Sequence, residues 1–433
     1  MKIANLNEKS GKVELQGFVH EFRDMGGLKF LQLRDHSGTI QVTIVKNKVS
    51  EEVLDAVKGL TNESSVIVKG EVKTNEKAAS GLEIIPENIL VVSKAEPELP
   101  ISVNEKGITT GQSTRLDWRS LDLRKPRMQA IFTVQSAILE GMRKWLLDNE
   151  YRQVFTPCLL GVASESGSEV FPVVYFDKEA FLRQDPQLHR QLSVAGGITK
   201  VFDIGPAWRA EQSHTTKHLC EHRVCAVETG FIKDERDVER IEEQVVISAL
   251  TNVKEKCANE LKLLNVEVKI PKAPFPEFCF PELYDILAKK GKKLEHGSDM
   301  DTEAEKILWE HVKEEYGVEF YWVNRFPFKI KPFYVMRVDE EPDRARSIDL
   351  YFKGLELSSG GQREHRYEKI IEQVKEKGMN PESVEWFTKF FKYGVPTHGG
   401  FAIGIERITQ SLLNVENIRD CVLFPRDPDR LVP

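Results

Sequence analysis

The sequence predicts an α+β protein built from two domains. A chain of 433 residues is too long for one ordinary hydrophobic core. Polar and apolar residues alternate in short runs over the N-terminal quarter, which is typical of β-strands. A stretch with apolar residues three and four apart, typical of a helix, begins at Pro126. The segment 92–100 between them carries Pro97 and Pro100 and is expected to be extended, so we place a domain boundary near residue 100.

Five runs in the N-terminal part are expected to be strands. They are 12–19, 28–33, 39–45, 65–72 and 82–92. Gly26, Gly38 and Gly81 stand between runs and mark turns. Short strands joined by turns in this way indicate a small β-barrel of the OB-fold type. We therefore assign residues 1–100 to an OB-fold domain and residues 101–126 to a linker or hinge.

Positive charge gathers from residue 114 to residue 127, across the end of this linker. The residues are Arg115, Arg119, Arg124, Lys125 and Arg127. Such a run could contact an RNA backbone, although a solvated hinge surface is its more frequent meaning.

The second part of the chain predicts several helices. The stretch after Pro126 carries an apolar stripe that consists of Ile131, Val134, Ile138, Met142, Trp145 and Leu146. This stripe must be buried, either inside the chain or against a second subunit, and the pattern does not separate the two. Segments 233–256 and 365–377 carry mixed charge and are expected to be exposed helices.

Charge and composition exclude several classes of protein. A net charge of -7 gives no general attraction to nucleic acid, so any RNA contact must depend on local basic surface. No apolar run approaches the roughly 20 residues that span a bilayer, and the N-terminus lacks a secretory pattern. The 6 cysteines show no paired spacing, which fits free thiols in a reducing compartment. We expect a cytoplasmic protein without membrane contact.

One short segment holds residues that could bind zinc. They are His214, His218, Cys220, His222 and Cys225. Their spacing matches no common structural zinc pattern, so we do not expect a zinc site there.

Three segments carry residues suited to a nucleotide site. Segment 398–407 reads HGGFAIGIER; its glycines would let the backbone approach a flat ring or a phosphate, and Arg407 would face the same ligand from the start of a helix. Segment 202–211 reads FDIGPAWRAE and ends with an arginine two residues before a glutamate. Segment 347–364 reads SIDLYFKGLELSSGGQRE. A Walker loop is absent from the sequence, so a P-loop is not expected.

In chain order these segments resemble motif 2, the acidic metal-binding strand and motif 3 of class II aminoacyl-tRNA synthetases. The resemblance covers nearly the whole chain and is greatest to archaeal-type aspartyl enzymes. It implies that residues 127–433 form a catalytic domain with a central antiparallel sheet flanked by helices. It also implies that segment 128–157 is the dimerising motif 1, so the enzyme would be a homodimer. Segment 165–173 would cover the amino acid, and segment 184–191 would recognise its side chain.

The resemblance implies activation of L-aspartate by ATP. The catalytic residues would be Arg209 on the α-phosphate and substrate carboxylate, Arg407 on the γ-phosphate, and Glu356. Oxygen ligands from Asp349, Glu356 and Ser359 would hold Mg²⁺, which such ligands suit better than zinc. The implied ATP-binding residues are Arg209, Ala210, Glu211, Lys217, His218, Leu219, Glu356, Gly404, Ile405, Glu406 and Arg407.

Aspartate is expected rather than asparagine. Arg363 resembles the family arginine that pairs with the side-chain carboxylate, and Arg190 stands where the family has a second cation, a lysine. Two cations favour an acidic side chain over its amide. The implied amino-acid-binding residues are Glu165, Gln184, Gln187, Leu188, His189, Arg190, Arg209, Ser359 and Arg363.

The chain departs from the family pattern in this pocket. Asp185 replaces the usual serine, Arg190 the usual lysine, and Lys217 an arginine. Ala226 stands where the family has an aspartate that anchors the ammonium group. We hypothesise that Asp185 supplies the missing anion, in which case Asp185→Ser would raise the KM for aspartate, and an unchanged KM would rule the compensation out.

The barrel residues that match anticodon-binding positions of the family are Arg23, Phe30, Gln41 and Glu83. Phe30 would stack on the middle base and Gln41 would hydrogen-bond its edge; without the resemblance, Phe30 could equally be barrel core. His20 and Pro86 resemble the pair found in enzymes that also charge tRNA(Asn). We therefore expect tRNA(Asp) and also tRNA(Asn) as partners.

Other functions remain open. An AMP-forming amide ligase descended from a synthetase fits the altered pocket, although the barrel counts against it. An asparaginyl enzyme is the nearest alternative of the same class. A non-catalytic RNA-binding paralogue would have no reason to keep Arg209, Glu356, Ser359, Arg363 and Arg407.

Overall fold

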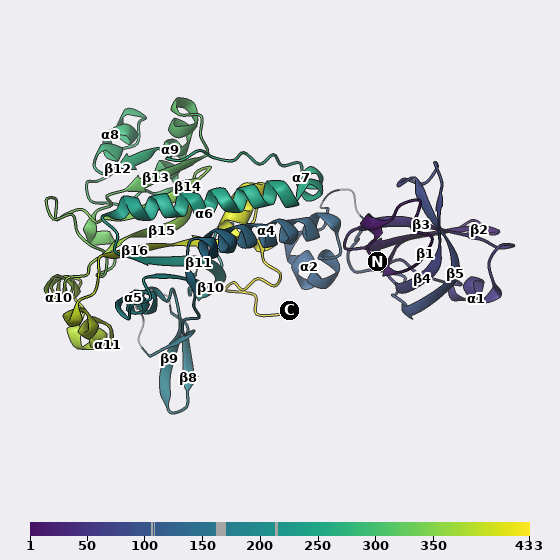
Figure 1. Ribbon diagram of the computed structural model, residues 1–433, viewed down its shortest axis with the longest axis horizontal. Coiled ribbons are helices and arrows are strands. Elements are labelled where there is room, and N and C mark those ends of the chain that lie inside the picture. The colour runs from purple at the N-terminus through teal and green to yellow at the C-terminus, as the bar shows by residue number, and fades with distance from the viewer. Residues whose placement is uncertain (105–106, 108, 162–169, 213–214) are drawn as a thin grey trace. The chain divides into compact units, whose positions relative to one another are not determined.

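The computed structural model describes residues 1–104, 107, 109–161, 170–212 and 215–433 (Figure 1). The chain divides into two compact units, Met1–Gln129 and Ala130–Pro433. The segment predicted as a linker thus lies in the first unit. No helix in the described part of the chain is long and apolar enough to cross a membrane.

The first unit contains a closed five-stranded barrel with the strand order β1-β2-β3-β5-β4. Its strands are β1 Lys12–Asp24, β2 Leu28–Asp35, β3 Gly38–Val45, β4 Ser65–Thr74 and β5 Leu82–Ser93. β3 and β5 pair in parallel and the other neighbours are antiparallel. Each of the five predicted runs is therefore a strand.

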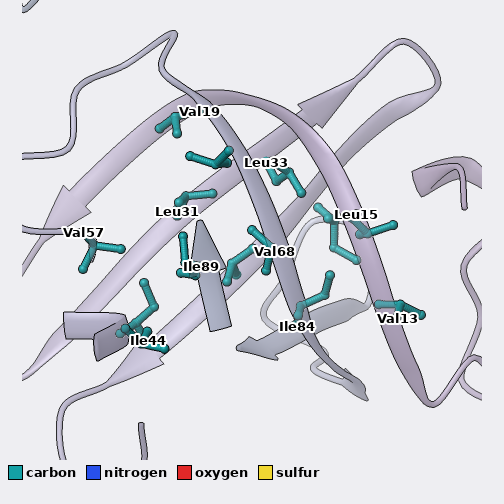
Figure 2. Close-up of a cluster of buried hydrophobic side chains, with 14 of the residues drawn as sticks. Val13, Leu15, Val19, Leu31, Leu33, Ile44, Val57, Val68, Ile84 and Ile89 are labelled. Atoms are coloured by element: carbon teal, nitrogen blue, oxygen red, sulfur yellow. The ribbon is translucent and has the colours of Figure 1, made fainter. Parts of the chain in front are cut away.

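The interior of the barrel follows from the alternation in its sequence. Side chains at every second position of β1 and β2 point inward, as Val13, Leu15, Leu31 and Leu33 do in Figure 2. The short helices η1 Ile3–Asn5 and α1 Glu51–Ala56 were not predicted; Ser50 caps α1 by accepting a hydrogen bond from the Val53 backbone.

Three of the five residues in the basic run after the barrel are buried rather than solvated. Helices α2 Gln112–Asp117 and α3 Arg119–Asp122 bury Arg115, Arg119 and Lys125 around one carboxylate. Their nitrogens lie 3.1, 2.8 and 3.1 Å from Asp122 oxygens. The expectation of exposure was wrong for these three residues because a buried partner for positive charge cannot be read from the run itself.

The second unit is built on an eight-stranded sheet with the order β12-β13-β14-β15-β16-β11-β10-β6. The strands in that order are Glu277–Cys279, Phe320–Asn324, Ser347–Phe352, Leu355–Arg363, His398–Gly404, Glu221–Gly230, Lys200–Trp208 and Arg152–Gln153. The six central strands are antiparallel, as predicted, and only the outer strands β12 and β6 pair in parallel. A small separate sheet consists of β7 Leu159–Leu160, β8 Pro172–Tyr175 and β9 Lys178–Leu182.

Two long helices, α4 Pro126–Asp148 and α6 Glu235–Lys256, run side by side (Figure 1). Ser248 Oγ donates to the Gly141 carbonyl at 2.9 Å, and a Cβ on Gly141 would lie 2.7 Å from Ala249 Cα. The apolar stripe of α4 is buried inside the unit, apart from half-buried Trp145. α6 was expected to be exposed, but its inner face lies on β14, β15 and β16 and buries Glu242 and Glu243.

The remaining helices surround the sheet and the smaller elements. They are α5 Gln187–Ala195, α7 Ala258–Leu264, α8 Glu282–Lys289, α9 Thr302–Glu315, α10 Tyr367–Glu376, α11 Glu385–Thr388 and α12 Ile405–Leu413, with 3₁₀ turns at Phe328–Ile330, Pro381–Val384, Lys389–Tyr393 and Ile418–Cys421. The helix predicted at 365–377 corresponds to α10.

Candidate active site

A cavity of about 280 Å³ lies on the eight-stranded sheet of the second unit. Strand β16 pairs with β11 on one side and β15 on the other, so segments far apart in the sequence meet there. The predicted site residues that line the cavity are Gln184, Gln187, Arg209, Glu211, Lys217, His218, Leu219, Glu356, Ser359, Arg363, Gly404, Glu406 and Arg407.

Not every predicted residue reaches the cavity wall. Ala210, Leu188, His189, Arg190, Asp349 and Ile405 do not line it. Leu188 belongs to a buried apolar cluster, and the His189 ring lies 5.2 Å from the Trp386 ring. Glu165 lies outside the described residues. Helix α5 thus turns only part of the predicted recognition segment toward the cavity.

Arg407 stands in the first turn of α12, beside Glu356 of β15. Its Nη1 donates to the Glu356 backbone oxygen at 2.9 Å and to Oε1 at 3.3 Å. Its side chain is 25% exposed, which leaves part of the guanidinium accessible to a ligand.

Two glycines of β16, Gly399 and Gly400, make room for neighbouring strands rather than for a ligand. A Cβ on Gly399 would lie 2.7 Å from the Gly361 carbonyl, and one on Gly400 would lie 2.0 Å from the Val227 carbonyl. Their absence of side chains lets neighbouring strands approach. The expectation that these two glycines bring the backbone toward a ring or phosphate was wrong, whereas Gly404 does line the cavity.

The predicted magnesium ligands come together across two paired strands. Asp349 of β14 lies opposite Ser359 of β15. Asp349 Oδ2 accepts a hydrogen bond from Lys331 Nζ at 3.0 Å, while the buried Oδ1 has no hydrogen-bond partner in the described part of the chain. Burial raises the pKa of Asp349 to about 6; Lys331 opposes this shift and Glu356 adds to it. A buried oxygen without a partner, next to further oxygen ligands, fits a hard cation.

The residues considered as zinc ligands form no such site among the residues that the structure describes, where no group of three or more histidine, cysteine or acidic residues could hold a metal ion. His214 lies outside the described residues.

One end of the cavity is a hydrogen-bond network around Gln187. Gln187 Nε2 donates to Glu228 at 2.9 Å, and its Oε1 accepts from Arg363 Nη2 at 3.0 Å and from Arg190 Nη2 at 2.8 Å. Arg363 Nε donates to Glu228 at 3.1 Å, and Nη2 donates to the Gly400 carbonyl at 2.9 Å. The Arg363 side chain is therefore fixed by several acceptors while it faces the cavity.

Arg190 lies behind this wall. Its side chain is fully buried, and its two terminal nitrogens each lie 2.7 Å from one oxygen of Asp185. The Asp185 side chain does line the cavity. Ala226 of β11 is buried opposite Ala402 and contributes no polar group.

Sequence reasoning missed His222, Lys331 and Tyr334, which also line the cavity. Burial and the charges of Arg209 and Arg407 lower the pKa of His222 to about 3, so its ring is neutral. His222 could have been found from strand period, because it stands two and six residues before Val224 and Glu228 on β11 and therefore shares their face. Lys331 and Tyr334 lie in loop segments without such a signal.

In the barrel, the predicted anticodon-binding side chains share adjoining strands. Arg23 pairs with Phe30 across β1 and β2, and Gln41 pairs with Glu83 across β3 and β5. Gln41 Nε2 lies 3.4 Å from Glu83 Oε2, which also accepts from Asn75 Nδ2 at 2.8 Å. Phe30 is half-buried and does not belong to the buried barrel core.

The two residues predicted to set tRNA choice are held differently. His20 Nδ1 lies 2.6 Å from Arg34 Nη1, whereas Pro86 is buried at the irregularity where β5 pairs with Gly70 of β4.

Comparison with protein families identifies the second unit. The model of a family described as tRNA synthetases class II (D, K and N) matches residues 111–428, which include the whole described wall of the cavity. The chain belongs to this family. The model of an OB-fold nucleic acid binding domain matches residues 13–92, which confirms the fold predicted for the barrel.

Relatives of this class II synthetase share nearly its full length. The aspartate–tRNA(Asp) ligase of Pyrococcus furiosus is 43% identical over 427 residues, which cover 98% of this chain and 97% of the relative. The aspartate–tRNA(Asp/Asn) ligase of Archaeoglobus fulgidus is 43% identical over 422 residues, covering 98% and 96%. The structure of asparaginyl-tRNA synthetase from Pyrococcus horikoshii with asparaginyl-adenylate has a TM-score of 0.93 at 33% identity and covers 100% of this chain and 99% of that one. The predicted resemblance to the aspartyl and asparaginyl branch is confirmed.

Proposed function

We propose that the protein is an aspartate–tRNA ligase that activates L-aspartate with ATP and transfers it to tRNA(Asp) and tRNA(Asn). The observation that carries this proposal is that Arg209, Arg363, Glu356 and Arg407 line one and the same cavity. Arginine suits both phosphate and carboxylate because its planar guanidinium donates two parallel hydrogen bonds to two oxygens of one oxyanion. The aspartate–tRNA ligases among its relatives support the choice of substrate.

In this proposal the chain works mainly by positioning. Arg209 holds the carboxylate of aspartate in line with the α-phosphate of ATP, and Arg407 holds the γ-phosphate. The attack forms aspartyl-adenylate and releases pyrophosphate. The 3'-hydroxyl of the terminal adenosine of tRNA then attacks the aspartyl carbonyl and releases AMP, and a phosphate oxygen accepts the proton.

Asp349, Glu356 and Ser359 would hold Mg²⁺. The ion would supply positive charge to the phosphate oxygens when bound. The partnerless Asp349 Oδ1 supports this assignment.

The side chain of aspartate is assigned to Arg363. Glu228, Gln187 and the Gly400 carbonyl fix this guanidinium at the cavity wall. Glu228 already balances its charge, but a carboxylate would accept a charge-assisted hydrogen bond from this guanidinium, which is stronger than the bond that an amide oxygen accepts. One observation favours asparagine as a second candidate: Asp185 already pairs with Arg190, one of the two cations expected to select the acid.

The barrel is assigned to the anticodon. Phe30 is exposed enough to stack on a base, and Gln41 and Glu83 present polar groups beside it. His20 and Pro86 support relaxed tRNA choice by their resemblance to the pair in enzymes that charge both tRNAs.

Charging of two transcripts tests this function. They differ only in the last anticodon base, C or U, and each is incubated with ATP and labelled aspartate. We expect comparable aspartylation of both. Rejection of the U form would contradict the relaxed choice, and no aspartylation of either would favour the amide ligase or the asparaginyl enzyme.

We further propose that the enzyme is a cytoplasmic homodimer. Phe155, in the segment that resembles motif 1, is 84% exposed, and Leu159 nearby is 46% exposed. Apolar side chains exposed together in this way are typical of interfaces.

A further inference from the structure

We propose that Asp185 binds the ammonium group of the amino acid and that Arg190 is a positioning residue that holds the Asp185 carboxylate without reaching the ligand. This inference rests on the proposed activation of an amino acid in the cavity. It changes the expected part of Arg190, which the resemblance placed against the substrate's side chain.

The geometry separates the two residues. The Asp185 side chain is 16% exposed and lines the cavity, whereas that of Arg190 is 0% exposed and does not. Two parallel hydrogen bonds of 2.7 Å join them, which fixes the carboxylate in orientation as well as place. Each carboxylate oxygen has two acceptor positions, so Asp185 can accept from Arg190 and also from an ammonium group.

Asp185 also lies in the right part of the cavity. Burial opposes its ionisation, but the charge and hydrogen bonds of Arg190, and the charges of Arg363 and Arg209, lower its pKa. Asp185 lines the same cavity as Arg209 and Arg363, and Arg190 and Arg363 both donate to Gln187 Oε1. An α-amino acid carries its ammonium group one bond from the carbon that joins its carboxylate and side chain, so the anchor must lie near the groups that bind both.

Other acidic residues are less suited to this part. Glu228 has no exposed surface and already accepts from Gln187 and Arg363. Glu211, Glu356 and Glu406 are the remaining acids in the described wall, and they stand on segments assigned to ATP. Ala226 offers only a buried methyl group.

Arg190 acts on a second wall residue as well. Its Nη2 donates to Gln187 Oε1, the atom that also accepts from Arg363. Arg190 thus positions the ammonium anchor and supports the orientation of the side-chain arginine.

The experiment compares aspartate with succinate, which is aspartate without its amino group. Aspartate-dependent ATP–pyrophosphate exchange gives the KM, and inhibition of this exchange gives the Ki of succinate. For Asp185→Asn we expect the KM for aspartate to rise about tenfold or more, since a charged hydrogen bond is lost, while the Ki of succinate does not rise. An equal rise in the KM for aspartate and the Ki of succinate would overturn the proposal, because it would mean that Asp185 and Arg190 act on a carboxylate that both ligands carry. An unchanged KM would overturn it too.

A double-mutant cycle tests the positioning role. Arg190→Met should raise the KM in the wild-type background and raise it less in Asp185→Asn, because part of its effect runs through Asp185; the rest runs through Gln187 and should raise the Ki of succinate as well. Effects on the KM that multiply fully would mean that Arg190 does not act through Asp185 and would overturn its positioning role. Arg190→Lys provides a second variant if the methionine variant does not fold: it keeps the charge but loses the fork, so we expect a raised KM, and a wild-type KM would contradict positioning.

Arg325→Met is the matched control. It removes an arginine 2.7 Å from the buried carboxylate of Glu235, in the same unit but outside the cavity wall, and should leave both constants unchanged. If the wild type activates another amino acid, the proposed function fails. The inference is then judged by the same ratio with that amino acid and its analogue without the amino group.

Discussion

The arginines at the cavity are distinguished by what fixes them. Arg363 is held by the Glu228 carboxylate, the Gln187 amide and the Gly400 carbonyl. Arg407 is held by Glu356. Arg190, which lies behind the cavity wall, is held by Asp185. In the proposed site the same residue type would therefore bind a ligand in one place and support another side chain in another. Sequence alone does not separate these roles, because the difference lies in which partner each guanidinium meets.

Arg407→Lys tests the phosphate contact. The lysine keeps the charge but loses the planar fork, so we expect kcat/KM for ATP in pyrophosphate exchange to fall by about 10- to 100-fold. Arg240→Lys, on the exposed side of α6, is the control and should behave as wild type. Equal values for Arg407→Lys and wild type would remove Arg407 from the ATP site.

Glu242 is a buried carboxyl group outside the cavity wall, and its pKa should make the stability of the protein depend on pH. Ser358 Oγ donates to its Oε1, and its buried Oε2 has no hydrogen-bond partner in the described part of the chain. Burial raises the pKa of Glu242 to about 8 from the model-compound value of 4.5. The folded state therefore holds this proton more tightly than the unfolded state, and the stability that depends on it is lost as pH rises from 4.5 through 8.

Glu242→Gln should abolish this dependence. We expect wild type and variant to have similar free energies of unfolding near pH 5, and the variant to be more stable by on the order of a few kcal/mol near pH 9. Urea unfolding at both pH values measures the difference. The same difference at pH 5 and pH 9 would show that Glu242 is ionised in the folded protein.

At the scale of elements, the sequence predicted individual strands and helices but not which residues meet across the sheet. Alternation predicted the five barrel strands, and helical spacing predicted α4, because both signals lie within one element. Neither signal revealed that α6 covers the sheet with buried Glu242 and Glu243. Neither revealed that Gly399 and Gly400 make room for adjacent strands. Those features depend on strands distant in sequence. The family resemblance supplied most cavity residues, but the burial of Arg190 required the structure.

A substitution in the barrel should weaken tRNA binding and leave amino-acid activation unchanged. Gln41→Ala removes a polar group beside Phe30 and Glu83, so we expect the KM for tRNA to rise about tenfold while exchange without tRNA is unchanged. Gln16→Ala, on an exposed position of β1, is the control. An unchanged KM for tRNA would show that Gln41 does not contribute to anticodon binding.

At the scale of the whole molecule, the proposed homodimer predicts a mass in solution twice that of the 49.5 kDa chain. Phe155→Asp places a charge on the exposed segment after β6 and should shift light-scattering mass toward the monomer. Leu263→Asp, at a position 51% exposed on α7, should leave the mass unchanged. A wild-type monomer at micromolar concentration would contradict the dimer.

We propose above that one cavity activates aspartate for transfer to tRNA. The decisive measurement is ATP–pyrophosphate exchange with each of the proteinogenic amino acids, with and without tRNA. We expect exchange with aspartate and with no other amino acid. Exchange with a different amino acid, or with none, would contradict it and would mean that Asp185 and Ala226 mark a pocket adapted to another substrate.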